Sequence, residues 1–286
     1  MFPFIELFGK TIGMYGLMTL VGILAAGFYS CRIAKKMSYD DNELIVFLLI
    51  SSIGLFFGGH ILYALVNYKY ILYLIHNTEK LSSFYALFDS FRLLFGGSVF
   101  YGGLLGGIAA AYLYAGIKKR DFAFLSDICA PAIPLFHFFG RIACFLGGCC
   151  FGIEHDWGFT FHNSLVAQSN GVQRFPVQLL EALFNLALFF CLMYLQKRIY
   201  FDISDDTSSG KRQGRNIKNL CGRRLLFVYL MSYSTGRFFL EYLRGDSYRG
   251  HFLLFSTSQF IALVVFSVSL FLFLRGALKK NPPPLN

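Results

Sequence analysis

The sequence predicts an all-α integral membrane protein with seven transmembrane helices. Hydrophobic residues make up 56% of its 286 residues. They are collected into apolar runs of about 20 residues, which is the length of helix that crosses the hydrocarbon core of a bilayer. Basic residues fall in alternate loops between these runs, as they do in multi-pass membrane proteins. These observations favour a bundle of membrane-spanning helices over a soluble protein.

The apolar runs define the expected crossings in chain order. They cover residues 12–34, 44–66, 96–116, 122–147, 177–198, 224–243 and 252–274. The segment 70–95 is apolar only in patches, because Lys80, Asp89 and Arg92 interrupt it. We therefore expect an interfacial or re-entrant hairpin there rather than a crossing. No separate soluble domain is expected, so residues 1–286 are treated as a single membrane domain.

The distribution of charge predicts the orientation of the chain. The net charge of +10 comes from basic clusters at 32–36, 118–120, 197–224 and 275–280. The positive-inside rule assigns these loops to the cytoplasm, so the N-terminus is expected outside and the C-terminus in the cytoplasm. The polar segment 199–223 is then a cytoplasmic linker. Because topology explains the charge, it indicates contact with anionic lipid and no nucleic-acid partner.

Two arginines interrupt apolar runs. Arg141 lies near the end of the run in "PAIPLFHFFGRIACFLGGCCFG", and Arg237 lies within "FVYLMSYSTGRFFLEYLRGD". A charged side chain within a membrane is costly and usually faces a polar cavity or a partner. Taken singly, Arg141 could snorkel to the interface and Arg237 could pair with Glu241 four residues later. Taken together, two guanidiniums suggest a site for an anion, and the most abundant anion in a membrane is a lipid phosphate.

Other polar residues are expected at a similar depth. A rise of about 1.5 Å per residue places polar side chains from five helices in the outer half of the membrane. No comparable set is expected in the inner half. Tyrosines at this depth also fit an aromatic belt, and the histidines could be satisfied core residues, so the convergence itself favours a site. The set comprises Tyr15, His60, Tyr101, His137, Arg141, Arg237 and Glu241.

Two further motifs are explained by packing. Gly102/Gly106 and Gly103/Gly107 have the i, i+4 spacing of closely packed membrane helices. The spacing CxxxxCC of Cys144, Cys149 and Cys150 matches no zinc motif, and no pair of histidines stands beside it. A disulfide could form there if the loop is outside. Small buried packing residues are the favoured interpretation, and we expect no metal and no organic cofactor.

Five blocks of the chain, in order, resemble the prolipoprotein diacylglyceryl transferase family. They are "MYGLMTLVGILAAG", "FGGSVFYGGLLGG", "GRIACFLGGCCFG" (140–152), "RFPVQLLEALFN" (174–185) and "YSTGRFFLEYLRGD" (233–246). The resemblance implies that Arg141, Arg237 and Glu241 hold catalytic positions. It also implies substrate-binding positions at Tyr15, Gly102, Gly103, Cys144, Gly152, Tyr233 and Arg244.

The reaction implied by the resemblance is diacylglyceryl transfer in the bacterial cytoplasmic membrane. The donor is phosphatidylglycerol, the acceptor is the lipobox cysteine thiol of a prolipoprotein, and glycerol phosphate is released. Three positions depart from the family pattern. Tyr101 stands where the family usually has a catalytic histidine, Cys144 where it has an asparagine, and His60 where it has an arginine.

These residues suggest how the chemistry is divided. Arg141 and Arg237 are assigned to the leaving phosphate, because a guanidinium matches phosphate geometry and keeps its charge in apolar surroundings. Glu241 would hold Arg237 in place. The base for the thiol remains open. Tyr101 could act at the reacting centre, His60 or His137 could take the proton, or the arginines could lower the pKa of the thiol.

Two alternative functions remain open at this stage. One is a related phospholipid-dependent transferase with a different acceptor. The other is a lipid-binding or lipid-moving membrane protein without catalysis. Release of glycerol phosphate would separate an enzyme from a binder.

Overall fold

The computed structural model describes residues 3–7, 9–77, 83–164, 166–201, 224–245, 251–252 and 255–278. The chain divides into two compact units. Unit 1 comprises residues 1–38 and 123–286, and unit 2 comprises residues 39–122.

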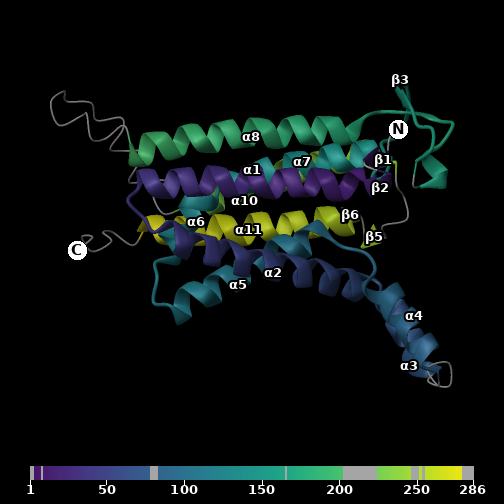
Figure 1. The fold of residues 1–286 in the computed structure, drawn as a ribbon, viewed down its shortest axis with the longest axis horizontal. Coiled ribbons are helices and arrows are strands. Elements are labelled where there is room, and N and C mark those ends of the chain that lie inside the picture. The colour runs from purple at the N-terminus through teal and green to yellow at the C-terminus, as the bar shows by residue number, and fades with distance from the viewer. Residues whose placement is uncertain are drawn as a thin grey trace. The chain divides into compact units, whose positions relative to one another are not determined.

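Unit 1 is a bundle of helices that run side by side (Figure 1). Helix α7 packs against α1 and α8, and α10 packs against α8 and α11. The helices are α1 (Met14–Lys36), α6 (Phe122–Cys129), α7 (Ala132–Gly147), α8 (Val177–Tyr200), α10 (Leu225–Leu240) and α11 (Thr257–Leu278).

The crossing expected over residues 122–147 is broken into α6 and α7, whose axes differ by 42°. The break falls at Ala130–Pro131. Proline has no amide hydrogen to continue the α6 ladder, and it disfavours the helical conformation of the residue before it. Pro134 is tolerated because it lies in the first turn of α7, where backbone amides have no intrahelical acceptor. Gly148 ends α7 in the left-handed region at φ 70°.

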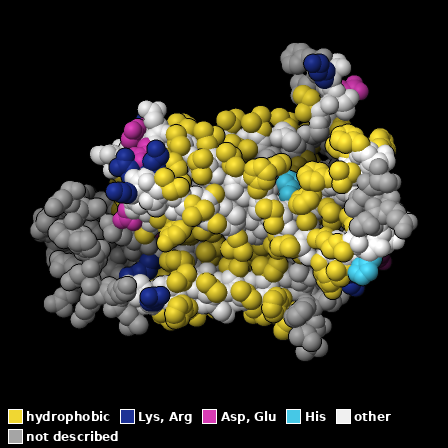
Figure 2. Space-filling model, turned by 90° about the horizontal axis from the view of Figure 1, so that it is seen from below, with side chains coloured by type: hydrophobic (Ala, Val, Ile, Leu, Met, Phe, Trp, Pro, Cys, Tyr) yellow, Lys and Arg dark blue, Asp and Glu magenta, His cyan; other side chains and the backbone are white. Residues whose placement is uncertain are grey.

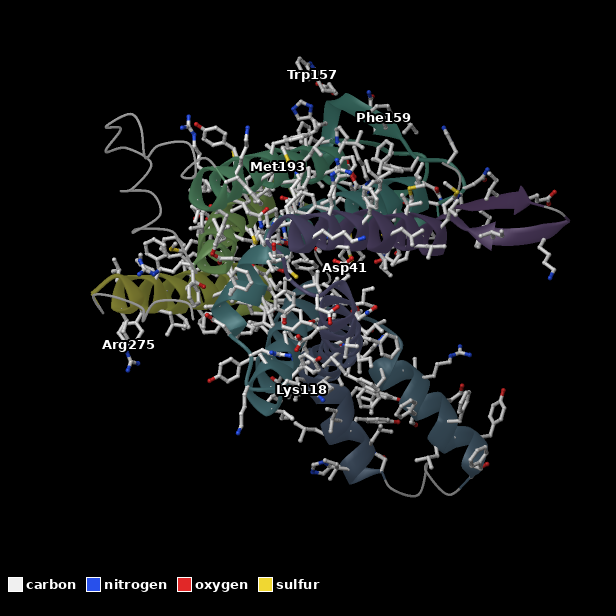
Figure 3. All side chains as sticks on the ribbon, turned by 60° about the vertical axis from the view of Figure 1, so that its left-hand side comes forward. Asp41, Lys118, Trp157, Phe159, Met193 and Arg275 are labelled. Atoms are coloured by element: carbon white, nitrogen blue, oxygen red, sulfur yellow. The ribbon has the colours of Figure 1, made fainter. Side chains whose placement is uncertain are left out.

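Short strands gather at one end of the unit 1 helices (Figure 1). They form three antiparallel pairs. The first pair is β1 (Phe4–Leu7) with β2 (Lys10–Gly13), and the second is β3 (Glu154–Thr160) with β4 (Gln173–Arg174). The third pair is β5 (His251–Phe252) with β6 (Phe255–Ser256). The 3-10 turns are η2 (Ala167–Ser169) and η3 (Glu241–Leu243). Figure 3 shows Trp157 and Phe159 on β3, and Trp157 is 78% exposed.

Unit 2 contains α2 (Asp41–Val66), α3 (Tyr68–His76), α4 (Phe84–Phe95) and α5 (Phe100–Ile117). Helices α2 and α5 pack closely through glycines. A Cβ added at Gly58 or Gly106 would collide with the backbone of the facing helix. The predicted packing through small residues is therefore confirmed.

The segment expected to be a hairpin contains α3 and α4, of nine and 12 residues. Each is too short to cross a hydrocarbon core of about 30 Å. Residues 78–82 between them lie outside the described part of the chain, so the turn of the expected hairpin lies outside it as well. Most of the expected linker at 199–223 also lies outside the described residues.

The helices identify a multi-pass membrane protein of the all-α class. Within the described ranges, α1, α2, α5, α8 and α11 are each long and apolar enough to cross a membrane, and the bent pair of α6 and α7 would make a sixth span. Their outward faces carry large apolar side chains, and hydrophobic side chains cover much of the face in Figure 2. Helix α10 has 16 residues and extends about 24 Å, which is short of a full crossing.

Candidate active site

Arg141 lies at the centre of a buried polar cluster in unit 1. It shares one face of α7 with His137, one turn earlier, and its Nε donates a hydrogen bond to His137 Nε2 over 3.1 Å. Its Nη2 lies 2.8 Å from Oε1 of Glu181 on α8. All three residues are buried, with Glu181 only 1% exposed. Arg141 is therefore held by the interior of the helix bundle rather than turned toward an interface.

Glu181 is the residue that the sequence reasoning missed. It is the only acidic residue in the apolar run 177–198. The argument that singled out the arginines applies equally to a carboxylate in a membrane helix, so this signal could have found it. Glu181 Oε1 also lies 3.9 Å from His137 Nε2 and accepts a hydrogen bond of 3.5 Å from the Tyr233 hydroxyl of α10. Glu181 thus links α7, α8 and α10.

The second arginine lies on α10, one turn after Tyr233. Arg237 forms an ion pair with Glu241, as their i, i+4 spacing predicted. Ser256 Oγ donates a hydrogen bond of 2.8 Å to the other carboxylate oxygen, Glu241 Oε1. Arg244 Nε lies 4.0 Å from Glu241 Oε2. Glu241 is therefore fixed from both sides, and it fixes Arg237 in turn.

The two ion pairs belong to one cluster. The rings of His137 and Tyr233 lie 5.0 Å apart, between the two arginine-bearing helices. Tyr233 donates a hydrogen bond to Glu181 and lies one turn before Arg237 on α10, so it links the two ion pairs. The cluster joins residues from α7, α8, α10 and the turn after α10.

Positive charge exceeds negative charge in this cluster. Its arginines are Arg141, Arg237 and Arg244, and its carboxylates are Glu181 and Glu241. Nη1 of Arg237 is buried and has no hydrogen-bond partner among the described residues. A buried guanidinium nitrogen without an acceptor is costly, and an anion with several oxygens would satisfy it. The arrangement is suited to hold a phosphate group.

The loop after α7 closes over this end of the bundle. Gly152 pairs with Arg244 in an isolated antiparallel bridge, and Ile153 N donates to Leu243 O over 3.0 Å. A Cβ at Gly152 would collide with the carbonyl oxygens of Phe175 and Leu243. Close backbone packing therefore explains the glycine at this position, and its predicted contact with substrate stays a prediction.

Two other predicted residues also lie in unit 1. Tyr15 begins the first turn of α1 and is 53% exposed. Cys144 is buried in the last turn of α7, three residues after Arg141. No disulfide joins the cysteines in the described part of the chain.

The remaining predicted residues lie in unit 2. His60 Nδ1 lies 2.6 Å from Phe95 O and 2.8 Å from Gly97 O, so this nitrogen donates and ties α2 to the end of α4 and the turn after it. Tyr101 is buried in the first turn of α5. Gly102 and Gly103 face the backbone of α2, so packing accounts for both glycines. Unit 1 brings together His137, Arg141, Tyr233, Arg237, Glu241 and Arg244.

The chain is similar to known proteins over almost its whole length. The profile of the prolipoprotein diacylglyceryl transferase family matches residues 3–275. The phosphatidylglycerol–prolipoprotein diacylglyceryl transferase of Clostridium tetani is 33% identical over 270 residues, which are 94% of this chain and 94% of the relative. A second enzyme of that name from Clostridium perfringens is 30% identical over 96% of this chain and 94% of the relative. The enzyme of that name from Idiomarina loihiensis is 31% identical over 95% of this chain and 90% of the relative.

The profile therefore covers the helices that build the arginine cluster and the loop that closes over it. Each of these relatives aligns along nearly its whole length, so the similarity is not confined to one apolar segment. This chain belongs to the prolipoprotein diacylglyceryl transferase family.

Proposed function

We propose that this chain transfers a diacylglyceryl group from phosphatidylglycerol to the lipobox cysteine thiol of a prolipoprotein and releases glycerol phosphate. The observation that carries the proposal is the buried excess of guanidinium groups around Arg237, with Nη1 left without an acceptor among the described residues. The names of the relatives give the same donor and acceptor. The chain is accordingly a membrane-bound transferase.

The arginines act on the leaving group. Negative charge builds on the phosphate oxygens as the carbon–oxygen bond breaks, so guanidiniums already in place stabilise the transition state more than the ground state. Arg237 would bind the phosphate through its Nη1 side, and Arg141 would support it from α7. Glu181 and Glu241 are positioning residues, because each holds one arginine by an ion pair.

The hydrogen bonds of the two histidines bear on which residue takes the proton of the acceptor thiol. His137 Nε2 accepts a hydrogen bond from Arg141, so its lone pair is occupied and its proton lies on Nδ1. This argues against His137 as the base. His60 donates from Nδ1, which leaves its Nε2 lone pair able to accept a proton. Tyr101 takes the family's histidine position in the sequence, and we assign it to hydrogen bonding at the reacting centre.

The membrane arrangement is part of the proposal. Seven crossings require α10 to span the membrane together with η3, and the two would extend about 30 Å. The basic loops support an outside N-terminus and a cytoplasmic C-terminus in the bacterial cytoplasmic membrane, with both units forming a single membrane domain. A reporter fused within 199–223 should report cytoplasm, and one within 150–170 should report the outside. Opposite signals would overturn this orientation.

The reaction is tested with purified protein, phosphatidylglycerol labelled in its glycerol head group, and a lipobox peptide. Release of labelled glycerol phosphate is expected only with the cysteine peptide and not with its serine analogue. Release of glycerol phosphate at the same rate with and without the peptide would support the alternative transferase with another acceptor. Binding of the lipid without release under any condition would support the non-catalytic binder.

A further inference from the structure

Three thiols meet beside the arginine cluster. The Sγ atoms of Cys144, Cys149 and Cys150 all lie within 4.8 Å of one another. The sequence spacing alone did not indicate this, because residues five and six positions apart do not share a face of a regular helix. The backbone after α7 brings them together, with Cys149 N donating to Cys144 O over 3.1 Å.

The turn that brings the three thiols together contains two residues in the left-handed region of backbone conformation. Gly148 has φ 70°, and Cys150 has φ 56° although it is not a glycine. A side chain in the left-handed region costs about 1–2 kcal/mol. Ser164 packs against Gly148, where an added Cβ would collide with it. Cys150 therefore has an unfavourable backbone conformation, and its sulfur lies within 4.8 Å of the other two.

The geometry fits a thiophilic metal ion. Zinc binds thiolate sulfur at about 2.3 Å, so three ligands of a tetrahedral site lie about 3.8 Å apart. The sulfurs of this cluster would need to approach by no more than about 1 Å to reach that spacing. Three protein ligands with a fourth position open is the pattern of catalytic zinc sites, whereas structural sites use four. Cys144 is buried, and Cys149 and Cys150 are half-buried, so the cluster is partly exposed.

The thiols and the arginine cluster are held by the same helices. Cys144 follows Arg141 by three residues, so both side chains lie on one face of α7. Gln178 of α8 donates a hydrogen bond of 2.8 Å to Cys149 O, one turn before Glu181. A sulfur bound here would therefore lie near Arg141, which supports the proposed phosphate site from α7.

We propose that Cys144, Cys149 and Cys150 bind Zn²⁺ or a similarly thiophilic ion, and that its open position receives the acceptor cysteine as a thiolate. The inference rests on the proposed transferase function. It extends that function to the step for which the sequence lacks the family's histidine, because a thiol that coordinates a metal loses its proton outright.

The step balances without a redox change. The acceptor thiol releases its proton to solvent on binding the ion. Its sulfur then attacks the glyceryl carbon that carries the phosphate ester, and a carbon–sulfur bond forms. The carbon–oxygen bond breaks, and its electron pair leaves with the glycerol phosphate near Arg237. The thioether product is neutral and binds the ion weakly, so it can be replaced by the next thiol.

The metal site is tested without reference to activity. The full-length protein is purified reduced and metal-free in detergent and titrated with Co²⁺, whose thiolate charge-transfer absorption reports cysteine ligands. One ion per chain is expected, displaced by Zn²⁺. Cys149→Ser and Cys150→Ser should lose the absorption, and Cys191→Ser, on the exposed face of α8, should keep it. Thermal unfolding of each variant checks that it is folded.

The acceptor is tested on the same sample. A lipobox peptide should change the cobalt spectrum, and its serine analogue should not. Unchanged absorption in Cys149→Ser and Cys150→Ser would mean adventitious binding and overturn the site. A disulfide between any two of the three cysteines in active protein, found by non-reducing mass spectrometry, would overturn it too.

Transfer activity separates this inference from the function on which it rests. A free thiol of pKa about 8.5 is only about 3% ionised at pH 7, so removing the metal should slow transfer by about tenfold or more. Added Zn²⁺ should restore the rate. Full activity of metal-free protein would overturn the metal inference and leave the transferase function standing. Cobalt that binds the peptide thiol in a protein without any transfer would confirm the site and contradict the transferase.

Discussion

Unit 1 contains two buried polar clusters at opposite ends of α8 and α10, and they differ in how completely their groups are paired. At one end, Asp127 accepts a hydrogen bond of 2.7 Å from the Tyr200 hydroxyl and one of 2.8 Å from Leu225 N. Gln196 donates to the Asp127 carbonyl and accepts from Tyr29. Both oxygens of the Asp127 carboxylate are thus used, and one of them caps the first turn of α10.

The arginine cluster at the other end is not balanced in this way. Three arginines meet two carboxylates, and Nη1 of Arg237 has no acceptor among the described residues. A fully paired cluster stabilises the fold, whereas an excess of buried donors indicates a place for a ligand. The contrast also corrects the expectation that only one end of the membrane segments would gather polar residues. Asp127, Gln196 and Tyr29 gather at the other end, but as a structural group.

The largest effect is expected from the arginines. Arg141→Lys and Arg237→Lys keep the charge but lose the planar fork that binds two phosphate oxygens. Each should lower turnover by about 10²–10³-fold, the loss seen when one stabilising donor is removed from a transition state. The measurement is glycerol phosphate release by folded protein, with exposed Arg198→Lys as the matched control. Near-normal turnover in both variants would refute the phosphate site.

Glu181→Gln should have the next largest effect. The amide keeps the size of the side chain but removes the negative charge that pairs with Arg141, leaving a buried cation uncompensated. Such a loss typically costs about 3–5 kcal/mol of stability. We expect a lower thermal unfolding temperature and slower turnover, and bound phospholipid should partly restore the unfolding temperature. Wild-type stability and rate would show that Glu181 does not hold Arg141.

Replacement of Tyr101 tests the base. Loss of one hydrogen bond at the reacting centre should slow transfer about tenfold in Tyr101→Phe. His137→Phe should act mainly through the position of Arg141, and His60→Phe should abolish transfer only if His60 is the base. The transfer rates of the three variants, measured on one verified acceptor, show which residue acts as the base. Full activity of Tyr101→Phe would remove Tyr101 from the mechanism.

The smallest effect on turnover is expected from Asp127→Asn, although it alters the other buried cluster. An amide cannot accept with both terminal atoms, so either the Tyr200 hydroxyl or Leu225 N loses its acceptor. The free energy of unfolding should fall by about 1–3 kcal/mol. Turnover per folded molecule should stay within about twofold, because the group lies outside the proposed site. A loss of turnover in Asp127→Asn as large as that in Arg237→Lys would contradict the assignment of one cluster to structure and the other to catalysis.

Several features followed from the sequence because their causes are local. The long apolar runs became helices within a few residues of the expected bounds, and the i, i+4 glycines of α5 became the contact with α2. Arg237 and Glu241 pair because four residues make one turn. The break before α7 was missed although Pro131 was visible, because an unbroken apolar run was read as an unbroken helix.

The sequence by itself determined the membrane helices, the family and the two arginines, because hydrophobic length and the cost of a buried charge do not depend on the partner. Only the tertiary structure decided which group balances each arginine. Arg141 pairs with Glu181 of a different helix, and no spacing along the chain encodes that contact. The meeting of Cys144, Cys149 and Cys150 likewise depends on the left-handed backbone of Gly148 and Cys150. Long-range packing, rather than local pattern, set the chemistry of this site.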